Sequence, residues 1–309
     1  MVRSLFIVSL LILSTCSFAT CYGKEPRPWH KVTSWGYQLQ HPKPHQIAAS
    51  HFDLVVIDYS RDGCNFGRFT PKEVAKMKKK PDGRRRLVVA YMSIGEAEPY
   101  RFYWKKGWQP GNPSWLLTPN PRWPDNYRVK FWNPEWQEII YGREGSYLDQ
   151  IIDAGFDGAY LDIVDGYEAF MKKRPKAKKE MKNFIRDLAA YARMVKGDTD
   201  FGIFPQNAPE LLKDKKYLNL ITGLGKEEVY FFDTDDKTEE EDREWDEGLL
   251  DKVKNAGKLV LTVDYAHEEE NIKETIKRAR KKGYIPYVTD VELDRLNVYD
   301  EAKYLSSGK

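Results

Sequence analysis

The sequence has few of the residues on which thiol, serine and cofactor chemistry depends. Its 309 residues include 3 cysteines and 5 histidines. It contains no Gly-x-Ser-x-Gly turn, no paired Cys and His motif and no Gly-rich phosphate loop. These absences argue against a serine or cysteine hydrolase and against a nucleotide-binding enzyme. We expect the protein to use no cofactor.

Metal-binding patterns are also missing. His41 and His45 are four positions apart, but prolines flank and separate them, so a helix that would bring the two imidazoles together is not expected. The acidic run "DTDDKTEEE" at 233–241 lacks the glycine that a calcium-binding loop needs. The sequence therefore predicts no metal site.

Neither sign of charge dominates the chain. There are 50 basic and 47 acidic residues, so the formal net charge is only +3. The two basic runs, "KMKKKPDGRRR" at 76–86 and "KKRPKAKKEMK" at 172–182, are typical of solvated helix faces. Nucleic acid is therefore not an expected partner.

A long apolar run occurs only at the N-terminus. Arg3 precedes "LFIVSLLIL" at 5–13, which is too short to span a bilayer but has the length of the apolar core of an export signal. The small-x-small stretch 17–19 is a cleavage candidate. We predict that residues 1–19 are a signal peptide, that the protein is secreted or periplasmic, and that no integral membrane segment remains after cleavage.

Two details of this region bear on anchoring and on disulfides. "LSTC", which ends at Cys16, is a poor lipoprotein box because Thr15 occupies a position where a smaller residue is usual. A lipid anchor is therefore possible but not favoured. Cleavage would leave Cys21 and Cys64, which could pair, although nothing in the sequence requires it.

The mature chain alternates between strand-like and helix-like segments. Several expected helices end at a glycine that precedes a strand, as at Gly155, Gly197, Gly257 and Gly283, where a left-handed C-terminal cap is needed. Eight apolar segments have strand character, namely 34–40, 53–60, 86–95, 158–164, 201–207, 220–230, 258–265 and 284–290. This alternation predicts an α/β fold, a (β/α)8 TIM barrel formed by a single domain over 20–309. A doubly wound sheet is the alternative, but it would usually carry a Gly-rich loop after its first strand.

The connection after the third expected strand is unusually long. The stretch 96–141 is rich in Trp, Tyr and Pro, and we expect it to form an extended aromatic-rich loop. Loops of this length inside a compact domain are commonly lids or binding elements.

Acidic residues stand at the ends of the expected strands. They are Asp58, Glu96, Glu98, Asp162, Asp165, Glu227, Glu228, Asp264 and Asp290. The carboxyl ends of barrel strands meet at one mouth, where active sites of this fold are built. Asp162 interrupts the apolar run "GAYLD" and shares a strand face with Tyr160, so we expect it to point into this mouth.

Several of these acids also have a structural interpretation. Asp165 is placed to cap a helix that begins near position 166. Asp58 and Asp264 could each pair with an Arg or Lys at the rim. Of the adjacent Glu227 and Glu228, only one should point inward, because side chains alternate along a strand.

Paired carboxylates among aromatic side chains indicate glycoside hydrolysis. One acid protonates the leaving oxygen, and the other attacks the anomeric carbon or activates water. The 9 Trp and 19 Tyr would supply flat surfaces for sugar rings. We therefore expect a polysaccharide or oligosaccharide as the substrate.

Three long motifs carry a family resemblance. "YMSIGEAEPYRFYW" (91–104), "NYRVKFWNPEWQ" (126–137) and "GFDGAYLDIVDGYEAF" (155–170) closely resemble the bacterial branch of glycoside hydrolase family 114, the endo-α-1,4-polygalactosaminidase-like proteins. The resemblance covers about 35–287. It implies a (β/α)8 barrel and hydrolysis of an α-1,4-linked galactosamine-type polysaccharide with retention of configuration.

The resemblance also implies roles for individual residues. Asp162 would be the nucleophile and Glu227 the general acid/base, with Glu228 as the alternative to Glu227. The positions that would bind substrate hydroxyls and any sugar amine are Asp58, Tyr59, Glu96, Asp165, Tyr167, Asn207, Glu228 and Asp264. Two other interpretations remain, namely a non-catalytic carbohydrate-binding protein on the same barrel and a structural envelope protein.

Overall fold

The computed structural model describes residues 27–299 and 301–305. The predicted signal peptide and Cys21 lie outside these residues. Within them, eight parallel strands form two hydrogen-bonded sheets. The first contains β1 (Trp35–Gln38), β2 (Leu54–Asp58), β3 (Leu87–Ser93), β7 (Gly158–Asp162) and β8 (Gly202–Pro205), in that order. The second has the order β13 (Ile285–Thr289), β12 (Leu259–Tyr265) and β9 (Gly223–Glu227).

The two sheets meet at both edges in a TIM-barrel-like arrangement. A single parallel bridge between Gln206 and Gly225 joins β8 to β9. At the other edge, Trp35 Nε1 donates to the Ile285 carbonyl oxygen at 2.9 Å. The predicted α/β fold with a parallel sheet is confirmed, whereas among the described residues no closed ladder is present. Pro205 lies in β8 at one of these edges, where it cannot donate a backbone hydrogen bond.

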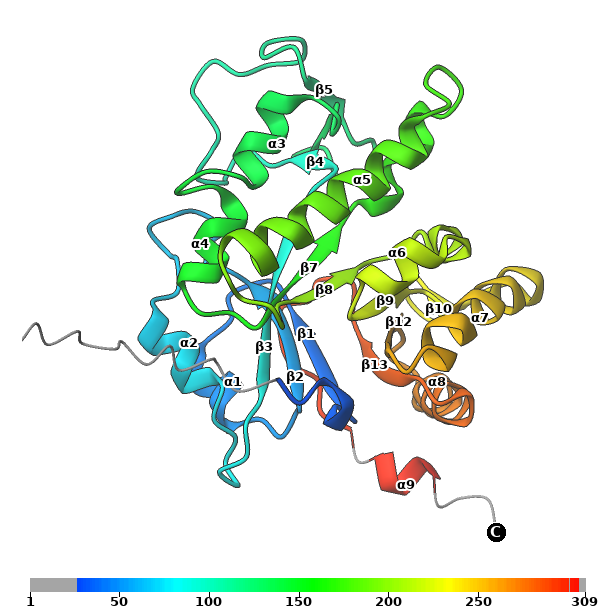
Figure 1. Cartoon of the computed structure of the whole chain (residues 1–309). Coiled ribbons are helices and arrows are strands. Elements are labelled where there is room, and N and C mark those ends of the chain that lie inside the picture. The colour runs from blue at the N-terminus through cyan, green and yellow to red at the C-terminus, as the bar shows by residue number, and fades with distance from the viewer. Residues whose placement is uncertain (1–26, 300, 306–309) are drawn as a thin grey trace, which may run out of the picture.

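The helices lie outside the strands (Figure 1). They are α1 (Pro44–Ala49), α2 (Pro71–Met77), α4 (Tyr147–Asp153), α5 (Ala177–Ala190), α6 (Lys215–Leu220), α7 (Glu240–Asn255), α8 (Glu269–Lys282) and α9 (Glu301–Leu305). Thr70 and Glu73 form the reciprocal capping box at the start of α2. Gly283 ends α8 with φ of 78°, and Gly257 follows α7 with φ of 69°. No described helix combines the length and the apolarity that a membrane crossing would need.

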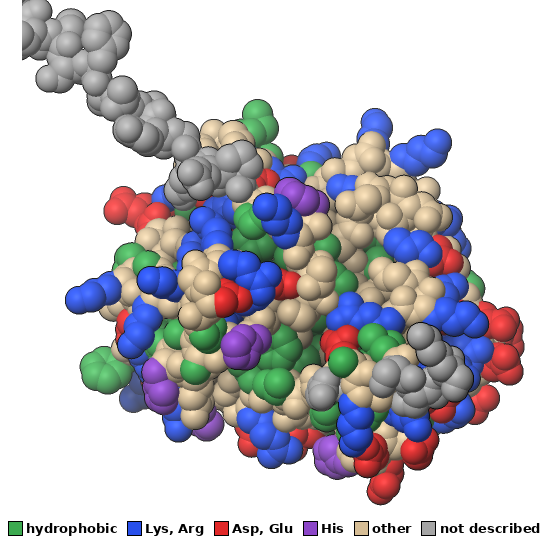
Figure 2. Space-filling model, turned by 90° about the horizontal axis from the view of Figure 1, so that it is seen from below, with side chains coloured by type: hydrophobic (Ala, Val, Ile, Leu, Met, Phe, Trp, Pro, Cys, Tyr) green, Lys and Arg blue, Asp and Glu red, His purple; other side chains and the backbone are tan. Residues whose placement is uncertain are grey.

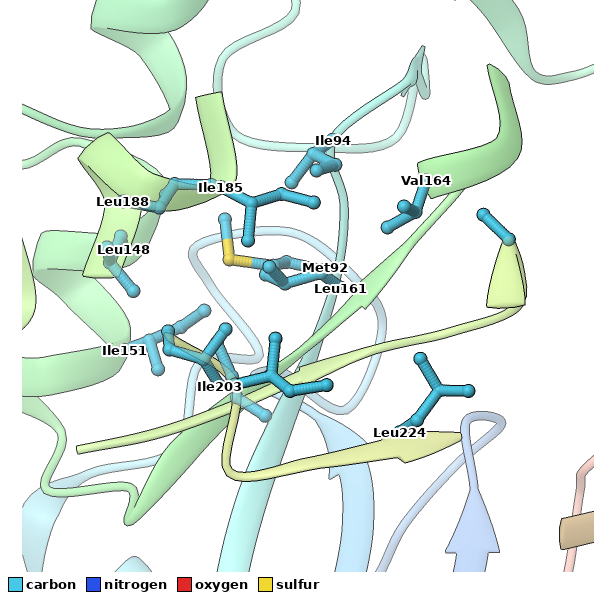
Figure 3. Packing of buried hydrophobic residues seen from close by; sticks show 14 of the residues in the cluster. Met92, Ile94, Leu148, Ile151, Leu161, Val164, Ile185, Leu188, Ile203 and Leu224 are labelled. Atoms are coloured by element: carbon cyan, nitrogen blue, oxygen red, sulfur yellow. The ribbon is translucent and has the colours of Figure 1, made fainter. Parts of the chain in front are cut away.

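The core has two parts, which correspond to the two faces of the strands. The larger part packs between the strands and the helices. In Figure 3, Met92 and Leu161 from the sheet lie close to Ile185 of α5 and Ile151 of α4. Because both strand faces are buried, the strands are apolar almost throughout, as expected for parallel strands covered on both sides.

The smaller part of the core fills the interior enclosed by the strands. It is rich in aromatic residues, which are Trp35, Tyr37, Tyr91, Tyr160, Phe204, Tyr265 and Tyr287. Gly225 makes room for one of them, because a Cβ at this position would lie 1.9 Å from the Tyr160 hydroxyl oxygen. The interior is thus a packed core that supports the ends of the strands from below.

The long segment after β3 is not simply a loop. It contains β4 (Glu96–Ala97), β5 (Leu116–Pro119) and β6 (Tyr127–Val129), which pair as an antiparallel sheet in the order β4–β6–β5, followed by α3 (Pro134–Ile140). Figure 1 shows β4, β5 and α3 beyond the ends of the parallel strands. Many of its aromatic residues pack on one another, as Trp115 does on Trp136, with ring centroids 5.0 Å apart. Much of the aromatic content of this segment is therefore part of the larger core that packs between the strands and the helices.

The face of the molecule seen from below in Figure 2 carries mixed charges. Lys and Arg side chains lie among Asp, Glu and apolar side chains on the part of this face that the structure describes. No continuous patch of one sign is seen there, in agreement with the near balance of charge in the sequence.

Candidate active site

A cleft of about 1120 Å³ opens at the carboxyl ends of the parallel strands. Asp162 and Glu227, the two predicted catalytic residues, both line it. Five of the other predicted site residues also line it, namely Asp58, Glu96, Asp165, Asn207 and Glu228. Their positions follow from the topology, since the parallel strands all end on the same side.

Asp162 is the last residue of β7 and is half-buried. Its Oδ2 accepts a hydrogen bond from the Tyr91 hydroxyl at 2.6 Å, and its Oδ1 accepts one from the Ile163 amide at 2.7 Å. Ile163 has a left-handed backbone, with φ of 55°, which turns the chain sharply at this point. Burial and the nearby charge of Glu227 raise the pKa of Asp162 well above its usual range.

Glu227 ends β9 and accepts hydrogen bonds from three side chains. The Tyr265 hydroxyl donates to Oε1 at 2.5 Å, while the Gln206 amide and the Asn207 amide, the latter at 2.9 Å, donate to Oε2. Asn207 also accepts from the Glu227 backbone amide at 3.1 Å, and its own backbone is left-handed, with φ of 60°. Each of these side-chain donors stabilises the ionised form of Glu227.

The two carboxyl groups therefore have different surroundings. Glu227 accepts hydrogen bonds from three side chains, which favour an ionised carboxylate. Asp162 instead has a raised pKa, because it is buried and close to the charge of Glu227. Two close acids titrate as a pair that holds one proton over a wide pH range. Burial and the charge of Glu227 favour the protonated form of Asp162 in the free protein. A site of this kind contains both a proton donor and a carboxylate, which acid–base chemistry requires.

One wall of the cleft contains a buried ion-pair cluster. Arg101 donates to Asp58 at 2.6 Å and to Glu98 at 2.5 Å, and the Tyr100 hydroxyl donates to Glu98 at 2.6 Å. Burial raises the pKa of Asp58 to about 6, although Arg101 opposes the shift. Asp58 thus has the Arg partner that its structural interpretation requires, while it also lines the cleft.

Three more acids line the cleft near the pair. Glu96 is buried and accepts from the Asn120 amide at 2.9 Å, and burial raises its pKa. Asp165 does not cap the short helix η2 (Val164–Phe170), and burial together with nearby Glu168 raises its pKa to about 6. Glu228 has a left-handed φ of 60°, which breaks the alternation of the strand and lets it face the cleft together with Glu227.

Three predicted site residues lie outside the cleft lining. Tyr59 and Tyr167 are buried in the core between strands and helices, and Tyr59 packs edge-on against Tyr147 at 4.9 Å. Asp264 is fully buried and accepts hydrogen bonds from the amides of Tyr230 and Phe231 at 2.6 and 3.1 Å. The structure does not bring these three residues to the cleft, because each occupies the strand or helix face that is turned away from it.

Other residues in contact with the pair were not predicted from the sequence. They are Tyr91, Gln206 and Tyr265, with Tyr37 behind Gln206. Gln206 directly precedes the predicted Asn207, and Tyr265 directly follows the predicted Asp264. Alternation along β12 puts Tyr265 on the same strand face as Val263, and the structure shows that this face is the interior one. The described residues contain no group of three or more His, Cys, Asp or Glu arranged to hold a metal ion.

Residues 18–304 match the glycoside-hydrolase family GH114. The chain belongs to this family. It is 43% identical over 280 residues to an uncharacterized protein of Methanocaldococcus jannaschii, covering 86% of this chain and 78% of that protein. It is 37% identical over 311 residues to an uncharacterized protein of Thermotoga maritima, covering 96% of this chain and 92% of that protein.

Solved structures extend this comparison to the fold. The GH114 chain is similar to the glycoside hydrolase domain of PelA from Pseudomonas aeruginosa, with a TM-score of 0.64 and 18% identity. The match covers 86% of this chain and 98% of the PelA domain. At this identity the likeness shows a shared fold. Together with the family match, it supports glycoside hydrolysis as the general activity of this GH114 protein.

Proposed function

We propose that this GH114 protein is a secreted glycoside hydrolase that cleaves an α-1,4-linked galactosamine-type polysaccharide with retention of configuration. One observation carries the proposal: Asp162 and Glu227 face one cleft, close enough for the charge of Glu227 to raise the pKa of Asp162. Two carboxyl groups at one cleft are the minimal machinery for glycosidic bond cleavage.

The proposed reaction has two displacements. In the first, an Asp162 oxygen forms a bond to the anomeric carbon while the bond to the leaving oxygen breaks and Glu227 gives its proton to that oxygen. In the second, Glu227 takes a proton from water, the water oxygen bonds to the anomeric carbon and the ester to Asp162 breaks. Each step leaves the protein ready for the next, and the cycle ends with Glu227 protonated again.

This reaction requires a proton on Glu227, whereas burial and the charge of Glu227 raise the pKa of Asp162 in the free protein and so favour a proton there. A positively charged substrate would reverse that arrangement. An ammonium group close to Asp162 would lower the pKa of this residue and let the proton move to Glu227. The acidic lining, which includes Asp58, Asp165 and Glu228, suits such a cation. A free amino sugar is therefore the substrate that these surroundings favour.

Hydrolysis and binding on defined polymers test the proposal. Purified protein is incubated with α-1,4-linked polygalactosamine, with its N-acetylated form and with a neutral α-1,4-linked glucan, and reducing ends are measured. We expect cleavage of the first polymer, little of the second and none of the third. Asp162→Asn and Glu227→Gln should abolish it, while the exposed Asp236→Asn serves as a matched control. Binding of the polymer without any cleavage by the wild-type protein would instead indicate a carbohydrate-binding protein.

Azide rescue assigns the two roles. In Asp162→Gly, azide can take the place of the nucleophile and should give a β-glycosyl azide from an activated α-linked substrate. In Glu227→Gly, azide should attack the covalent intermediate and give the α-glycosyl azide. The reverse pattern of anomers would exchange the roles of the two residues.

Secretion belongs to the same proposal. The N-terminal sequence supports cleavage after Ala19 and a single domain over 20–309. Mass spectrometry of protein expressed with its own N-terminus should find an exported product that begins at position 20. A product that begins at Met1 in the cell interior would contradict this part of the proposal.

A further inference from the structure

A chain of hydrogen bonds leads from the interior between the strands to Glu227. The Tyr37 hydroxyl donates to Gln206 Oε1 at 3.0 Å, and Gln206 Nε2 donates to Glu227 Oε2. Tyr37 is only 1% exposed and Gln206 only 3% exposed, so both side chains are buried where they meet. The chain joins β1, the end of β8 and the end of β9, which come from three different parts of the sequence.

The bond from Tyr37 determines which end of the Gln206 amide faces Glu227. An amide side chain has an accepting oxygen and a donating nitrogen at nearly equivalent positions, so its neighbours fix its orientation. Because the Tyr37 hydroxyl donates to the oxygen of Gln206, the nitrogen must point to the carboxylate. Without this hydroxyl the amide could turn over and place its oxygen against Glu227, which would repel the charge.

Tyr265 contacts the other oxygen of the Glu227 carboxylate. It ends β12, the strand that pairs with β9, and its hydroxyl donates to Glu227 Oε1.

Charged and titratable groups also surround Glu227. Those whose charge interacts with it are Asp162 and Tyr160 of β7, Asp165 of η2, the adjacent Glu228, Tyr265 and Tyr37. On its other neighbour, Lys226, the ammonium donates to the Glu227 carbonyl oxygen and pairs with Asp246.

We propose that Gln206, Tyr265 and, through Gln206, Tyr37 are positioning residues that fix the orientation of the Glu227 carboxylate and stabilise its charge in the free protein. Tyr91 has the corresponding position at Asp162, to which its hydroxyl donates. The inference rests on the proposed function where it concerns catalysis, because it assigns these residues to the acid/base group of that reaction. Its consequence for protonation holds whether or not the protein is catalytic.

Carboxyl NMR titration tests the inference without any need for activity. The protein is labelled with ¹³C at glutamate and aspartate carboxyls, and the resonances of Glu227 and Asp162 are assigned by Glu227→Gln and Asp162→Asn. Tyr265→Phe and Gln206→Met should each raise the pKa of Glu227 by about one unit, since each removes one donor to its ionised form. Tyr91→Phe should instead raise the pKa of Asp162.

A double-variant cycle tests the indirect role of Tyr37. Tyr37→Phe should raise the pKa of Glu227 in the wild-type background but should have no further effect when Gln206 is already Met, because Tyr37 acts only through that amide. Equal effects in both backgrounds would overturn the chain. If Tyr37→Phe does not fold, Tyr265→Phe and Gln206→Met still test the main inference. An unchanged pKa of Glu227 in both of these variants would refute it.

The pH profile of kcat, which reports the enzyme–substrate complex, connects the inference to catalysis. Under the proposed mechanism the alkaline limb of this profile reports loss of the Glu227 proton, so Tyr265→Phe should move that limb upward by about one unit, while Tyr91→Phe moves the acidic limb. Shifted NMR titrations in a protein that hydrolyses no polymer would refute the proposed function and support the inference. Normal hydrolysis by the wild-type protein, together with unchanged carboxyl titrations in the Tyr265, Gln206, Tyr37 and Tyr91 variants, would support the proposed function and refute the inference.

Discussion

Replacing Asp162 by Asn should stabilise the folded protein at alkaline pH while it abolishes activity. In wild type, burial and the charge of Glu227 raise the pKa of Asp162 above the value of 3.8 expected in an unfolded chain. A carboxyl whose pKa is raised on folding binds its proton more tightly in the folded state. Stability is therefore lost as the pH rises from the unfolded pKa to the folded pKa, and this loss persists at higher pH.

The size of the effect follows from the surroundings of Asp162. An Asn keeps the volume and can still accept the hydrogen bond from the Ile163 amide, while the Tyr91 hydroxyl can turn to accept from the new NH₂ group. The variant removes the buried like charge and leaves no polar group unpaired. Each unit of pKa shift corresponds to about 1.4 kcal/mol, and we expect a gain in the free energy of unfolding of roughly 1–3 kcal/mol at pH 9.

Urea unfolding followed by circular dichroism at pH 4, 7 and 9 measures this difference. We expect the stability difference between Asp162→Asn and wild type to be near zero at pH 4 and to grow toward pH 9. Glu227→Gln should behave oppositely and destabilise the protein at neutral pH, because its NH₂ group would meet the donors that now bind the carboxylate. Asp236→Asn, at an exposed position, should change stability little at any pH. A destabilised Asp162→Asn variant at pH 9, or a difference that does not vary with pH, would refute the reasoning.

Three further predictions concern the walls of the cleft and the interior. Trp123 lines the cleft with 58% of its surface exposed, so Trp123→Ala should raise KM for a polymer about tenfold through lost stacking, while the similarly exposed Trp245→Ala on α7 should not. Arg101→Met should destabilise the protein by about 3–5 kcal/mol in thermal or urea unfolding, because two buried carboxylates lose their partner; an unchanged midpoint would contradict this. Gly225→Ala should cost about 1–3 kcal/mol in the same measurement, since the new Cβ overlaps the Tyr160 hydroxyl, and a fully stable variant would show that the interior can adjust.

Much of the fold could be predicted because it depends on local patterns. The eight expected strands all occur, with boundaries within a few residues of those expected, and glycines with left-handed backbones end or follow helices as predicted. Local patterns do not predict how the two sheets join, at β8 on one edge and at β13 on the other. Whether neighbouring strands form a continuous ladder depends on long-range register, and the sequence pattern of a single strand carries no information about it.

The candidate site was predicted in part for the same reason. Asp162 and Glu227 interrupt apolar runs at strand ends, and such interruptions are visible in the sequence. The choice between Asp264 and Tyr265 was not visible. A strand that is buried on both faces shows no alternation of polar and apolar residues, so its pattern does not tell which face turns inward. Here the interior face holds Tyr265.

The sequence by itself determined the order of strands and helices, the acids at the strand ends and the family. Only the tertiary structure decided which of those acids meet, because side chains distant in the chain become neighbours only when the strands are assembled. It also decided the surroundings of each acid: three donors around Glu227, a Tyr and an amide at Asp162, and an Arg between Asp58 and Glu98. The protonation state of a carboxyl depends on these neighbours, which local sequence does not specify.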